Sequence, residues 1–396
     1  METITILFWV FVFIVFYAYL GYGMLLFLII RLRRILGLGK PYTGNTDYEP
    51  EITLLVAAYN EKDYVTRKVE NSLELNYPRN KVKMVWVTDG SDDGTPDILA
   101  RYPDITVLHQ QERKGKITAM NRAIKLVKSP IIVFSDANTA LGKESLNLIV
   151  DLFRNPKVGC VSGEKRIQQQ GTETAAGAGE GIYWKYESTL KKWDAEWYSV
   201  VGAAGELFAV RTELCEDVEP DTLLDDFIIS LRIAMKGYTI QYNPEAYASE
   251  TASASVKEEL KRKIRISAGG IQSIVRLRKL LNIFKYGRLS FQYISHRVLR
   301  WSLAPLSLLF ILILNFLLCL SEIRSDHPGF YSLLLAAQVL FYLASMVGWI
   351  LENRQVRIKI LFVPYYFFIM NYSVYLGFFR YIRKAQSVNW ERAKRG

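Results

Sequence analysis

Four long stretches without a charged residue constrain this chain more than any other feature. They are Ile4–Ile30 (27 residues), Trp301–Leu320 (20), Pro328–Leu351 (24) and Ile360–Phe379 (20). About 20 apolar residues in a helix cross the hydrocarbon core of a bilayer, so each stretch is long enough to span it. We expect a transmembrane anchor over residues 1–34, because no basic leader or cleavage site marks a removable signal peptide. Further transmembrane segments are expected over residues 301–379.

The charged residues are unevenly spread along the 396 residues, whose net charge is +11. Twelve Lys or Arg residues and only two acids lie between Val256 and Arg300, directly before the second apolar stretch. Such a segment could bind nucleic acid, but beside a membrane span it is typical of amphipathic helices on an anionic lipid surface. We therefore predict basic interfacial helices over residues 254–300, with the lipid bilayer as partner and no nucleic acid.

Basic residues also suggest an orientation. The arginines at 31–34 follow the first stretch, so the positive-inside rule places the N-terminus outside and the middle of the chain in the cytoplasm, in a multi-pass protein of the plasma (inner) membrane. The basic tail at 380–396 also favours the inside, whereas three complete crossings after the middle domain would put it outside. The last stretch contains Pro364 and Asn371. It therefore either crosses, or is re-entrant or interfacial.

Between residues 47 and 253, short apolar stretches alternate with segments of helical spacing. The expected strands are Ile52–Ala57, Lys83–Thr88, Ile105–Leu108, Ile131–Phe134 and Val158–Ser162. The expected helices are Glu61–Leu75, Thr95–Arg101, Lys116–Val127 and Lys143–Phe153. This alternation predicts an α/β domain with a doubly wound, mostly parallel sheet. Ligands of such sheets bind beyond the carboxyl ends of the strands.

Three scattered cysteines fit a reducing cytoplasm.

Polar residues gather at those strand ends. Ala57–Glu61 reads AAYNE, Thr88–Thr95 reads TDGSDDGT, Arg113–Asn121 reads RKGKITAMN and Ser135–Asn138 reads SDAN. Each alone could be an ordinary turn or helix cap, but together on one rim they indicate a site for a nucleotide diphosphate.

The chemistry of these residues fits such a ligand. Asp89 can accept hydrogen bonds from a base edge or ribose, and Lys116 brings positive charge beside a helix N-terminus. Asp136 and Asn138 offer oxygen ligands to a divalent ion.

Two later segments extend this site. Val200–Arg211, VVGAAGELFAVR, is a turn of small residues entering a strand; it is either a tight hairpin or a place where substrate approaches the backbone at Gly205 and Glu206. Thr222–Tyr238 places Asp225 and Asp226 at a helix start. An acidic N-cap explains one aspartate easily; a general base would explain the second.

In this order, the motifs resemble those of inverting family-2 glycosyltransferases of GT-A fold. With the flanking apolar stretches, they resemble the membrane-embedded branch of hyaluronan, chitin-oligosaccharide, cellulose and poly-N-acetylglucosamine synthases. The resemblance implies a hexosyltransferase that transfers a sugar from a nucleotide-sugar donor with inversion at the anomeric carbon. The donor is expected to be UDP-linked and the cofactor to be Mg²⁺ or Mn²⁺. Its acceptor would be a hydroxyl of a saccharide or a lipid-linked sugar, in cell-surface polysaccharide or glycolipid synthesis.

The resemblance also assigns roles to residues. It places Ala57, Tyr59 and Glu61 by the nucleoside, Asp89 at the uracil or ribose and Lys116 at the nucleotide. It places Asp136 and position 138 at the metal, where Asn138 stands for an acid. It makes Asp226 the general base, with Asp225 in place of a glutamate.

One part of the family pattern differs. Polymer-making members carry Gln-x-x-Arg-Trp on the interfacial helix, where this chain has Arg262, Arg265 and Ile266. Arg265 matches and joins the expected acceptor site, but the stacking tryptophan is replaced. Processive polymerisation, transfer of single sugars to a lipid-linked acceptor and a catalytically weak nucleotide-sugar-binding scaffold all stay open as hypotheses.

Overall fold

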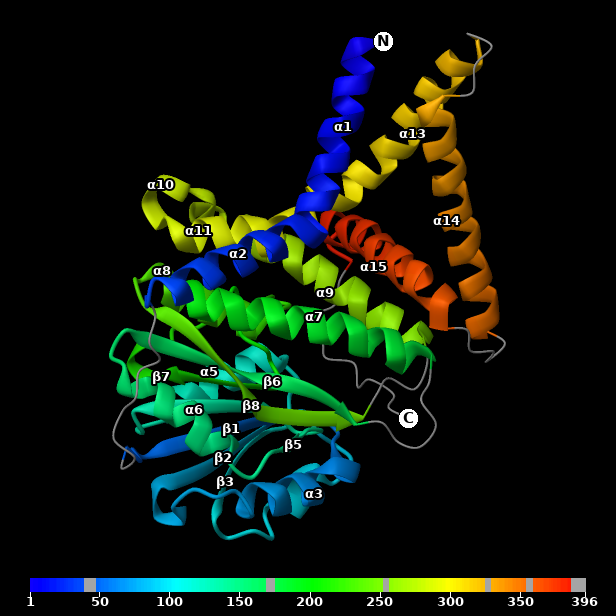
Figure 1. The fold of residues 1–396 in the computed structure, drawn as a ribbon. Coiled ribbons are helices and arrows are strands. Elements are labelled where there is room, and N and C mark those ends of the chain that lie inside the picture. The colour runs from blue at the N-terminus through cyan, green and yellow to red at the C-terminus, as the bar shows by residue number, and fades with distance from the viewer. Residues whose placement is uncertain (39–47, 169–174, 252–255, 325–328, 354–358, 386–396) are drawn as a thin grey trace.

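In the computed structural model, an α/β domain lies beneath a layer of helices, from which further helices project (Figure 1). The structure describes residues 1–38, 48–168, 175–251, 256–324, 329–353 and 359–385. The expected domain limits at residues 47 and 253–254, and most of the basic tail at 380–396, lie outside these ranges.

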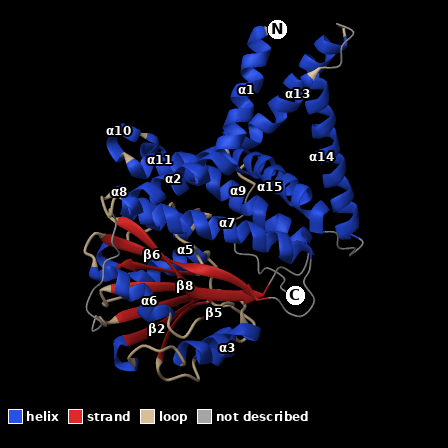
Figure 2. Ribbon diagram, in the orientation of Figure 1, coloured by secondary structure: helices blue, strands red, loops and turns tan. Residues whose placement is uncertain are grey.

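The sheet of the α/β domain has eight strands in the order β3-β2-β1-β4-β7-β6-β8-β5 (Figure 2). The strands β1 to β4 pair in parallel, β7 runs antiparallel to β4 and β6, β6 and β8 are parallel, and β5 is antiparallel to β8. Their bounds are β1 Ile52–Ala58, β2 Val82–Asp89, β3 Ile105–Gln110, β4 Ile131–Asp136, β5 Ala140–Leu141, β6 Val158–Gln168, β7 Leu207–Arg211 and β8 Thr239–Thr251. The expected mixed, mostly parallel sheet is confirmed.

Helices cover both faces of this sheet, which explains why β1 is buried along its whole length. Leu54 and Val56 face one hydrophobic core with α3 (Lys62–Leu73) and α6 (Ser145–Asp151). Leu55 and Ala57 alternate with them and face a second core with α5 (Lys116–Ile124) and α8 (Asp225–Met235). The remaining helices of the domain are α4 Thr95–Leu99, α5 Lys116–Ile124, α7 Ala175–Trp197 and α8 Asp225–Met235.

The interfacial segment belongs to the second core. It comprises α9 Val256–Arg276, α10 Ile283–Tyr286, α11 Arg288–Tyr293, the π-helix η6 Ile294–Val298 and α12 Leu299–Trp301. Leu280, Leu289 and Tyr293 pack in the same cluster as Phe134 and Phe227. The basic segment is therefore packed onto the sheet of the α/β domain as well as being amphipathic.

The N-terminal apolar segment, expected as an anchor over residues 1–34, consists of two helices that meet at a bend. The helix α1 (Glu2–Phe16) projects away from the domain, and after the π-helix η1 (Tyr17–Gly21) the helix α2 (Tyr22–Ile35) turns to lie along α7 (Figure 1). Tyr22 and Leu26 are buried against Leu190. The absence of charge cannot locate this bend, because the uncharged stretch Ile4–Ile30 continues from α1 through the bend into α2.

Among the described residues, four helices are long and apolar enough to cross a membrane: Glu2–Ile35, Leu303–Ile323, Phe330–Leu351 and Leu361–Ile382. The helices α13 (Leu303–Ile323) and α14 (Phe330–Asn353) project beside α1, but α15 (Lys359–Ile382) lies along α9 (Figure 1). The two backbones meet closely at Gly377, where a Cβ would come within 2.6 Å of Ser267 Cβ.

Candidate active site

The parallel strands bring the sequence-predicted residues to one edge of the sheet. In register, Ala58 of β1 lies opposite Thr88 of β2, and Ala57 lies opposite Asp136 of β4. The residues after these strands therefore meet at one rim, and two cavities open there.

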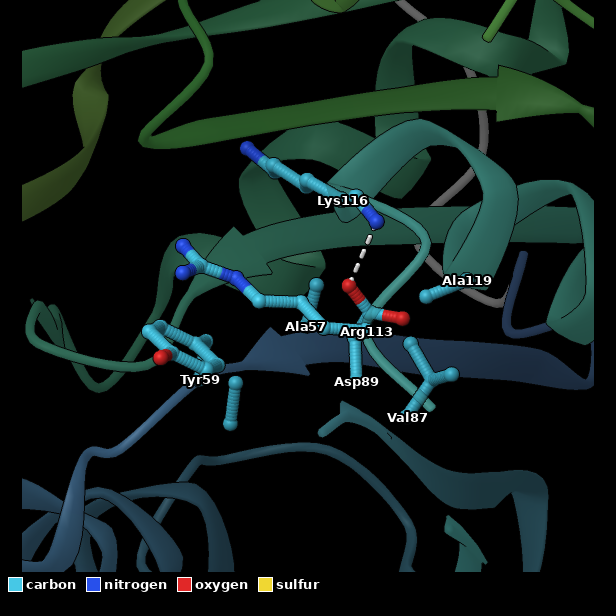
Figure 3. A pocket seen from close by; sticks show the side chains of 9 residues that line it. Ala57, Tyr59, Val87, Asp89, Arg113, Lys116 and Ala119 are labelled. Atoms are coloured by element: carbon cyan, nitrogen blue, oxygen red, sulfur yellow. Dashed lines mark hydrogen bonds between the residues drawn. The ribbon is translucent and has the colours of Figure 1, made fainter. Parts of the chain in front are cut away.

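The first cavity is a small pocket that includes Ala57, Tyr59, Asp89 and Lys116 (Figure 3). The guanidinium of Arg113 lies 3.7 Å above the centre of the Tyr59 ring. A planar cation and an aromatic ring at a pocket wall are suited to stack on a flat ring such as a nucleobase.

Asp89 shapes this pocket by holding the loop before α5 through hydrogen bonds to its backbone. Its carboxylate accepts hydrogen bonds from the backbone N–H groups of Lys114 (2.9 Å) and Gly115 (2.6 Å). Figure 3 shows one of these two bonds as a dashed line. Gly115 has a φ of +93°, a conformation that favours glycine. A carboxylate has about four acceptor positions, so Asp89 keeps capacity for a ligand while it fixes the start of α5.

The second cavity is a cleft of about 210 Å³ that contains the acidic residues. Lys116 Nζ lies 3.1 Å from Asp136 Oδ1 and 3.5 Å from Asp225 Oδ2. Burial alone would lower the pKa of Lys116, but Asp136, Asp225 and Asp226 together hold it above the ordinary value. Lys116 therefore stays charged in the cleft. Glu61, expected by the nucleoside, lines this cleft and not the small pocket.

Asp225 and Asp226 occupy the first turn of α8, where the helix dipole favours acids. Burial, reinforced by the nearby carboxylates of Asp225 and Glu206, raises the pKa of Asp226 to about 7. A carboxylate with a pKa near neutrality is a stronger base than an exposed one and is still ionised in part at pH 7.

Gly205 gives Asp226 the space it needs. A Cβ at position 205 would lie 3.2 Å from Asp226 Oδ2, closer than ordinary van der Waals contact. The small-residue turn at 200–206 therefore lets the backbone approach the carboxylate, as substrate access at Gly205 would require.

A buried ion-pair cluster supports Glu206. Lys165 Nζ lies 2.8 Å from Glu206 Oε1 and also pairs with Glu250. Burial raises the pKa of Glu206, but the charge and hydrogen bond of Lys165, a backbone hydrogen bond and the Arg262 cation together hold that pKa at about 2. Glu206 thus stays ionised beside Asp226.

A second buried lysine supports the turn after β4. Lys68 Nζ donates to Ser135 Oγ (2.7 Å) and Thr139 Oγ1 (3.2 Å), on either side of Asp136 and Asn138. Burial lowers the pKa of Lys68 to about 7.

The interfacial helix α9 forms the far wall of the cleft. Arg262, Arg265 and Ile266 line it together with Asp225 and Asp226. The expected acceptor residue Arg265 is therefore brought to the same cleft as the expected base.

The described residues contain no group of three or more His, Cys, Asp or Glu that could hold a metal ion by themselves. Asp136 and Asn138 line the cleft with oxygen atoms. Magnesium is usually bound by one or two protein oxygens together with substrate phosphates. The donor set therefore fits an ion held jointly by these two residues and a diphosphate.

Several site residues escaped the sequence analysis. Lys165 and Glu250 lie in strand segments beyond the apolar cores that we used to locate strands, and Lys68 lies inside a helix. The signal that could have found Lys165 is the charged GEKR segment at Gly163–Arg166, which directly extends a predicted strand. Arg113 opens a motif that we quoted, but no pattern in the sequence pairs it with Tyr59.

Comparisons with known proteins agree with this geometry. Poly-beta-1,6-N-acetyl-D-glucosamine synthases of Staphylococcus aureus (strain MSSA476) and Staphylococcus epidermidis are 26% and 24% identical over 247 and 233 residues, 60% and 57% of this chain. The matched region spans 59% and 56% of those relatives.

The fold also matches a solved structure. The mannosyltransferase PcManGT from Pyrobaculum calidifontis, solved with GDP-Man and Mn²⁺, is 22% identical, with a TM-score of 0.71 over 96% of this chain and 100% of that one. The family described as "Glycosyltransferase like family 2" matches residues 50–269, more than half of the chain. The protein therefore belongs to glycosyltransferase family 2 and is related to polysaccharide synthases.

Proposed function

We propose that the protein transfers a sugar, with inversion, from a nucleotide-sugar donor, expected to be UDP-linked, to a hydroxyl acceptor at the membrane. One observation carries this proposal: Asp226, Gly205 and Glu206 line both the cleft of Lys116 and Asp136 and a larger cavity that reaches the membrane-side helices. A base between a donor side and an acceptor side is what inverting transfer requires.

The donor would enter from the rim. Its nucleoside would bind at the wall formed by Tyr59, Arg113 and Asp89, and its diphosphate would reach Lys116. Asp136 and Asn138 would hold Mg²⁺ or Mn²⁺, which supplies charge to stabilise the leaving diphosphate. When the diphosphate carries that charge, Lys116 has an anionic partner besides Asp136.

The chemical step is a single displacement. Asp226 accepts the proton of the acceptor hydroxyl, whose oxygen bonds to the anomeric carbon as the bond from that carbon to the phosphate oxygen breaks. The nucleoside diphosphate leaves with the bonding electrons, and the sugar configuration inverts. Asp225 orients Lys116 and raises the basicity of Asp226 through its charge.

We also infer that the catalytic domain faces the cytoplasm, because the arginines at 31–34 follow the first apolar helix. The acceptor would then be met at the inner face of the membrane. A scaffold without activity is disfavoured because the cleft brings a candidate base, Lys116 and Asp136 together.

The test is Asp226→Asn in the purified full chain, incubated with a panel of UDP- and GDP-sugars and analysed by mass spectrometry. Transfer should fall at least about 100-fold, as for loss of a general base, with nucleotide binding retained. Asp217→Asn is the matched control, because Asp217 is exposed and pairs with exposed Lys125. Near-normal turnover of Asp226→Asn would remove the assigned base.

A further inference from the structure

A cavity of about 660 Å³ extends from the active site to the N-terminal apolar segment and α15. Gly205 and Asp226 lie at its inner end, and Phe16 and Leu20 of the N-terminal segment and Val363 of α15 lie at its outer end. These three outer side chains are 46%, 57% and 53% exposed although they line the cavity. Since all three belong to candidate membrane-spanning segments, the cavity opens toward lipid.

The wall between these ends is cationic. Lys191, Arg262, Lys263, Arg297 and Arg300 line the cavity, against three lining acids, Glu187, Glu206 and Asp226. A fourth acid, Glu259, pairs with Arg262 and Lys263 but does not line the cavity. Hydrocarbon requires no such charge, and a neutral saccharide needs hydroxyl partners in place of a cluster of cations. The excess of positive charge favours an anionic group between the two ends.

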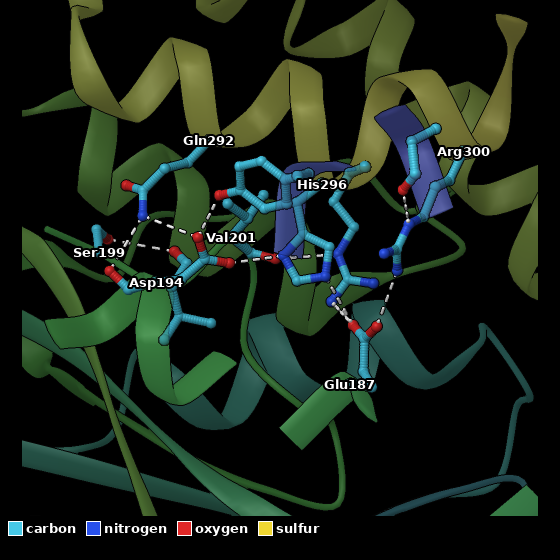
Figure 4. A network of polar contacts seen from close by, with 11 residues as sticks. Glu187, Asp194, Ser199, Val201, Gln292, His296 and Arg300 are labelled. Carbon is cyan, nitrogen blue, oxygen red and sulfur yellow. Dashed lines mark hydrogen bonds and ion pairs between the residues drawn. The ribbon is translucent and has the colours of Figure 1, made fainter. Parts of the chain in front are cut away.

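Two of these cations are rigidly placed. Arg297 Nη2 lies 2.6 Å from Glu187 Oε1, and Arg300 Nη1 lies 3.3 Å from Glu187 Oε2 (Figure 4). Arg300 also donates from Nε to the Ala18 carbonyl of η1. The two guanidinium groups share the carboxylate of Glu187, which holds both cations at a fixed point in the cavity.

The order along the cavity is therefore base, cations, apolar mouth. We propose that it binds a lipid-linked acceptor, in which an anionic phosphate or diphosphate separates the acceptor hydroxyl from a hydrocarbon chain. The hydroxyl reaches Asp226, the phosphate lies at Arg297 and Arg300, and the chain leaves between α1 and α15. This inference rests on the proposed function, because it names the acceptor class for the same base.

The test measures binding of farnesyl phosphate to the full chain in neutral detergent. Tryptophan fluorescence is a suitable signal because Trp184 and Trp301 line the cavity. Farnesol and inorganic phosphate, each lacking one half of the probe, should bind at least about tenfold more weakly. Equal binding of farnesol and farnesyl phosphate would overturn the proposal.

Variants separate the two ends of the site. Val363→Trp and Leu20→Trp should each weaken farnesyl phosphate binding by about tenfold or more by filling the mouth. Val339→Trp on α14 is the matched control, because Val339 is 46% exposed and lies outside the lining. Unchanged farnesyl phosphate binding in both Val363→Trp and Leu20→Trp would contradict the proposal.

Arg297→Gln should weaken binding of farnesyl phosphate but not of farnesol, with partial recovery in Arg297→Lys. Exposed Arg288→Gln on α11 is its control. An Arg297→Gln variant that binds farnesyl phosphate like the parent contradicts the phosphate position.

Nucleotide binding in the same preparations keeps the two proposals apart. If UDP binds and sugar transfers to a free saccharide while farnesyl phosphate does not bind, the lipid-linked acceptor is wrong and the proposed function stands. If the product is a long water-soluble polymer, the cavity holds the growing saccharide and the inference again fails. If no nucleotide binds and no sugar transfers, the proposed function itself fails.

Discussion

Asp226 shows how burial sets the working range of one carboxyl group. Its pKa is raised to about 7, first by burial and then by Asp225 and Glu206. A base accepts a proton only when it is ionised, so kcat/KM should fall about tenfold per pH unit below about pH 7 and level off above it.

Glu206→Gln tests the cause of that pKa, because it removes one of the like charges. The acid limb of the pH profile should move to lower pH, while Glu213→Gln, at an exposed position, should leave it in place. An acid limb that does not move in Glu206→Gln would show that Glu206 does not act on the base.

Gly205 is a second residue whose effect is local. In Gly205→Ala, the new methyl group lies 3.2 Å from Asp226 Oδ2, so the carboxylate must shift. Misplacing a catalytic group by less than about 1 Å can cost up to roughly 100-fold, and we expect kcat to fall by roughly 10- to 100-fold with little change in donor KM. Ala203→Gly, in the same turn, is the control. Gly237→Ala would not serve, because Gly237 has a φ of +96°, which an alanine rarely adopts.

At the scale of elements, the contacts of α15 favour one of the two orientations that the charges left open. Its buried side is held to the interfacial layer, with Asn371 accepting a hydrogen bond from Tyr19 (2.5 Å) and Ser373 facing Ser267 (3.3 Å). We propose that α15, which lies along α9, returns to the side of the catalytic domain and does not cross the bilayer. The polar Asn371, which first suggested a re-entrant or interfacial segment, is therefore a contact between membrane-side helices.

This placement predicts that both the C-terminus and the catalytic domain lie on one side of the membrane, opposite the N-terminus. An epitope tag at Met1 should be labelled in intact cells, and a tag after Gly396 only once the cells are permeabilised. Labelling of the C-terminal tag in intact cells would mean that α15 crosses the bilayer.

The elements that could be predicted are those with a local signal. The strands β1, β2 and β4 are apolar segments ended by polar residues, and the spacing in α5 and α8 begins at Lys116 and Asp225. By contrast, β8 mixes Asn243, Pro244 and Glu245 into a strand of 13 residues, so its alternation is broken. The positions of Asp136, Lys116 and Asp226 in one cleft follow from topology, which a periodic pattern does not encode.

At the scale of the whole molecule, one buried polar network joins the catalytic domain to the membrane-side helices. Asp194 of α7 accepts hydrogen bonds from Tyr22 of α2 and from Gln292 of α11, and it lies 2.6 Å from His296 Nδ1 (Figure 4). Glu187 adds Arg297 and Arg300. The residues that contact Asp194 are 98 to 172 residues away from it in sequence, so no local sequence motif indicates this network.

If this network fixes the base relative to the membrane-side cavity, Asp194→Asn should damage the whole molecule. Asparagine keeps the shape but loses the charge and brings an N–H₂ group toward donors, and breaking a buried charged pair costs about 3–5 kcal/mol. The thermal midpoint in detergent should fall, and transfer should fall more than nucleotide binding, because the rim pocket of Tyr59 and Asp89 lies on the far strands β1 and β2. Asp151→Asn, at an exposed helix end, is the control. Equal loss of nucleotide binding and transfer would mean that Asp194 supports folding alone and does not hold the acceptor side against the base.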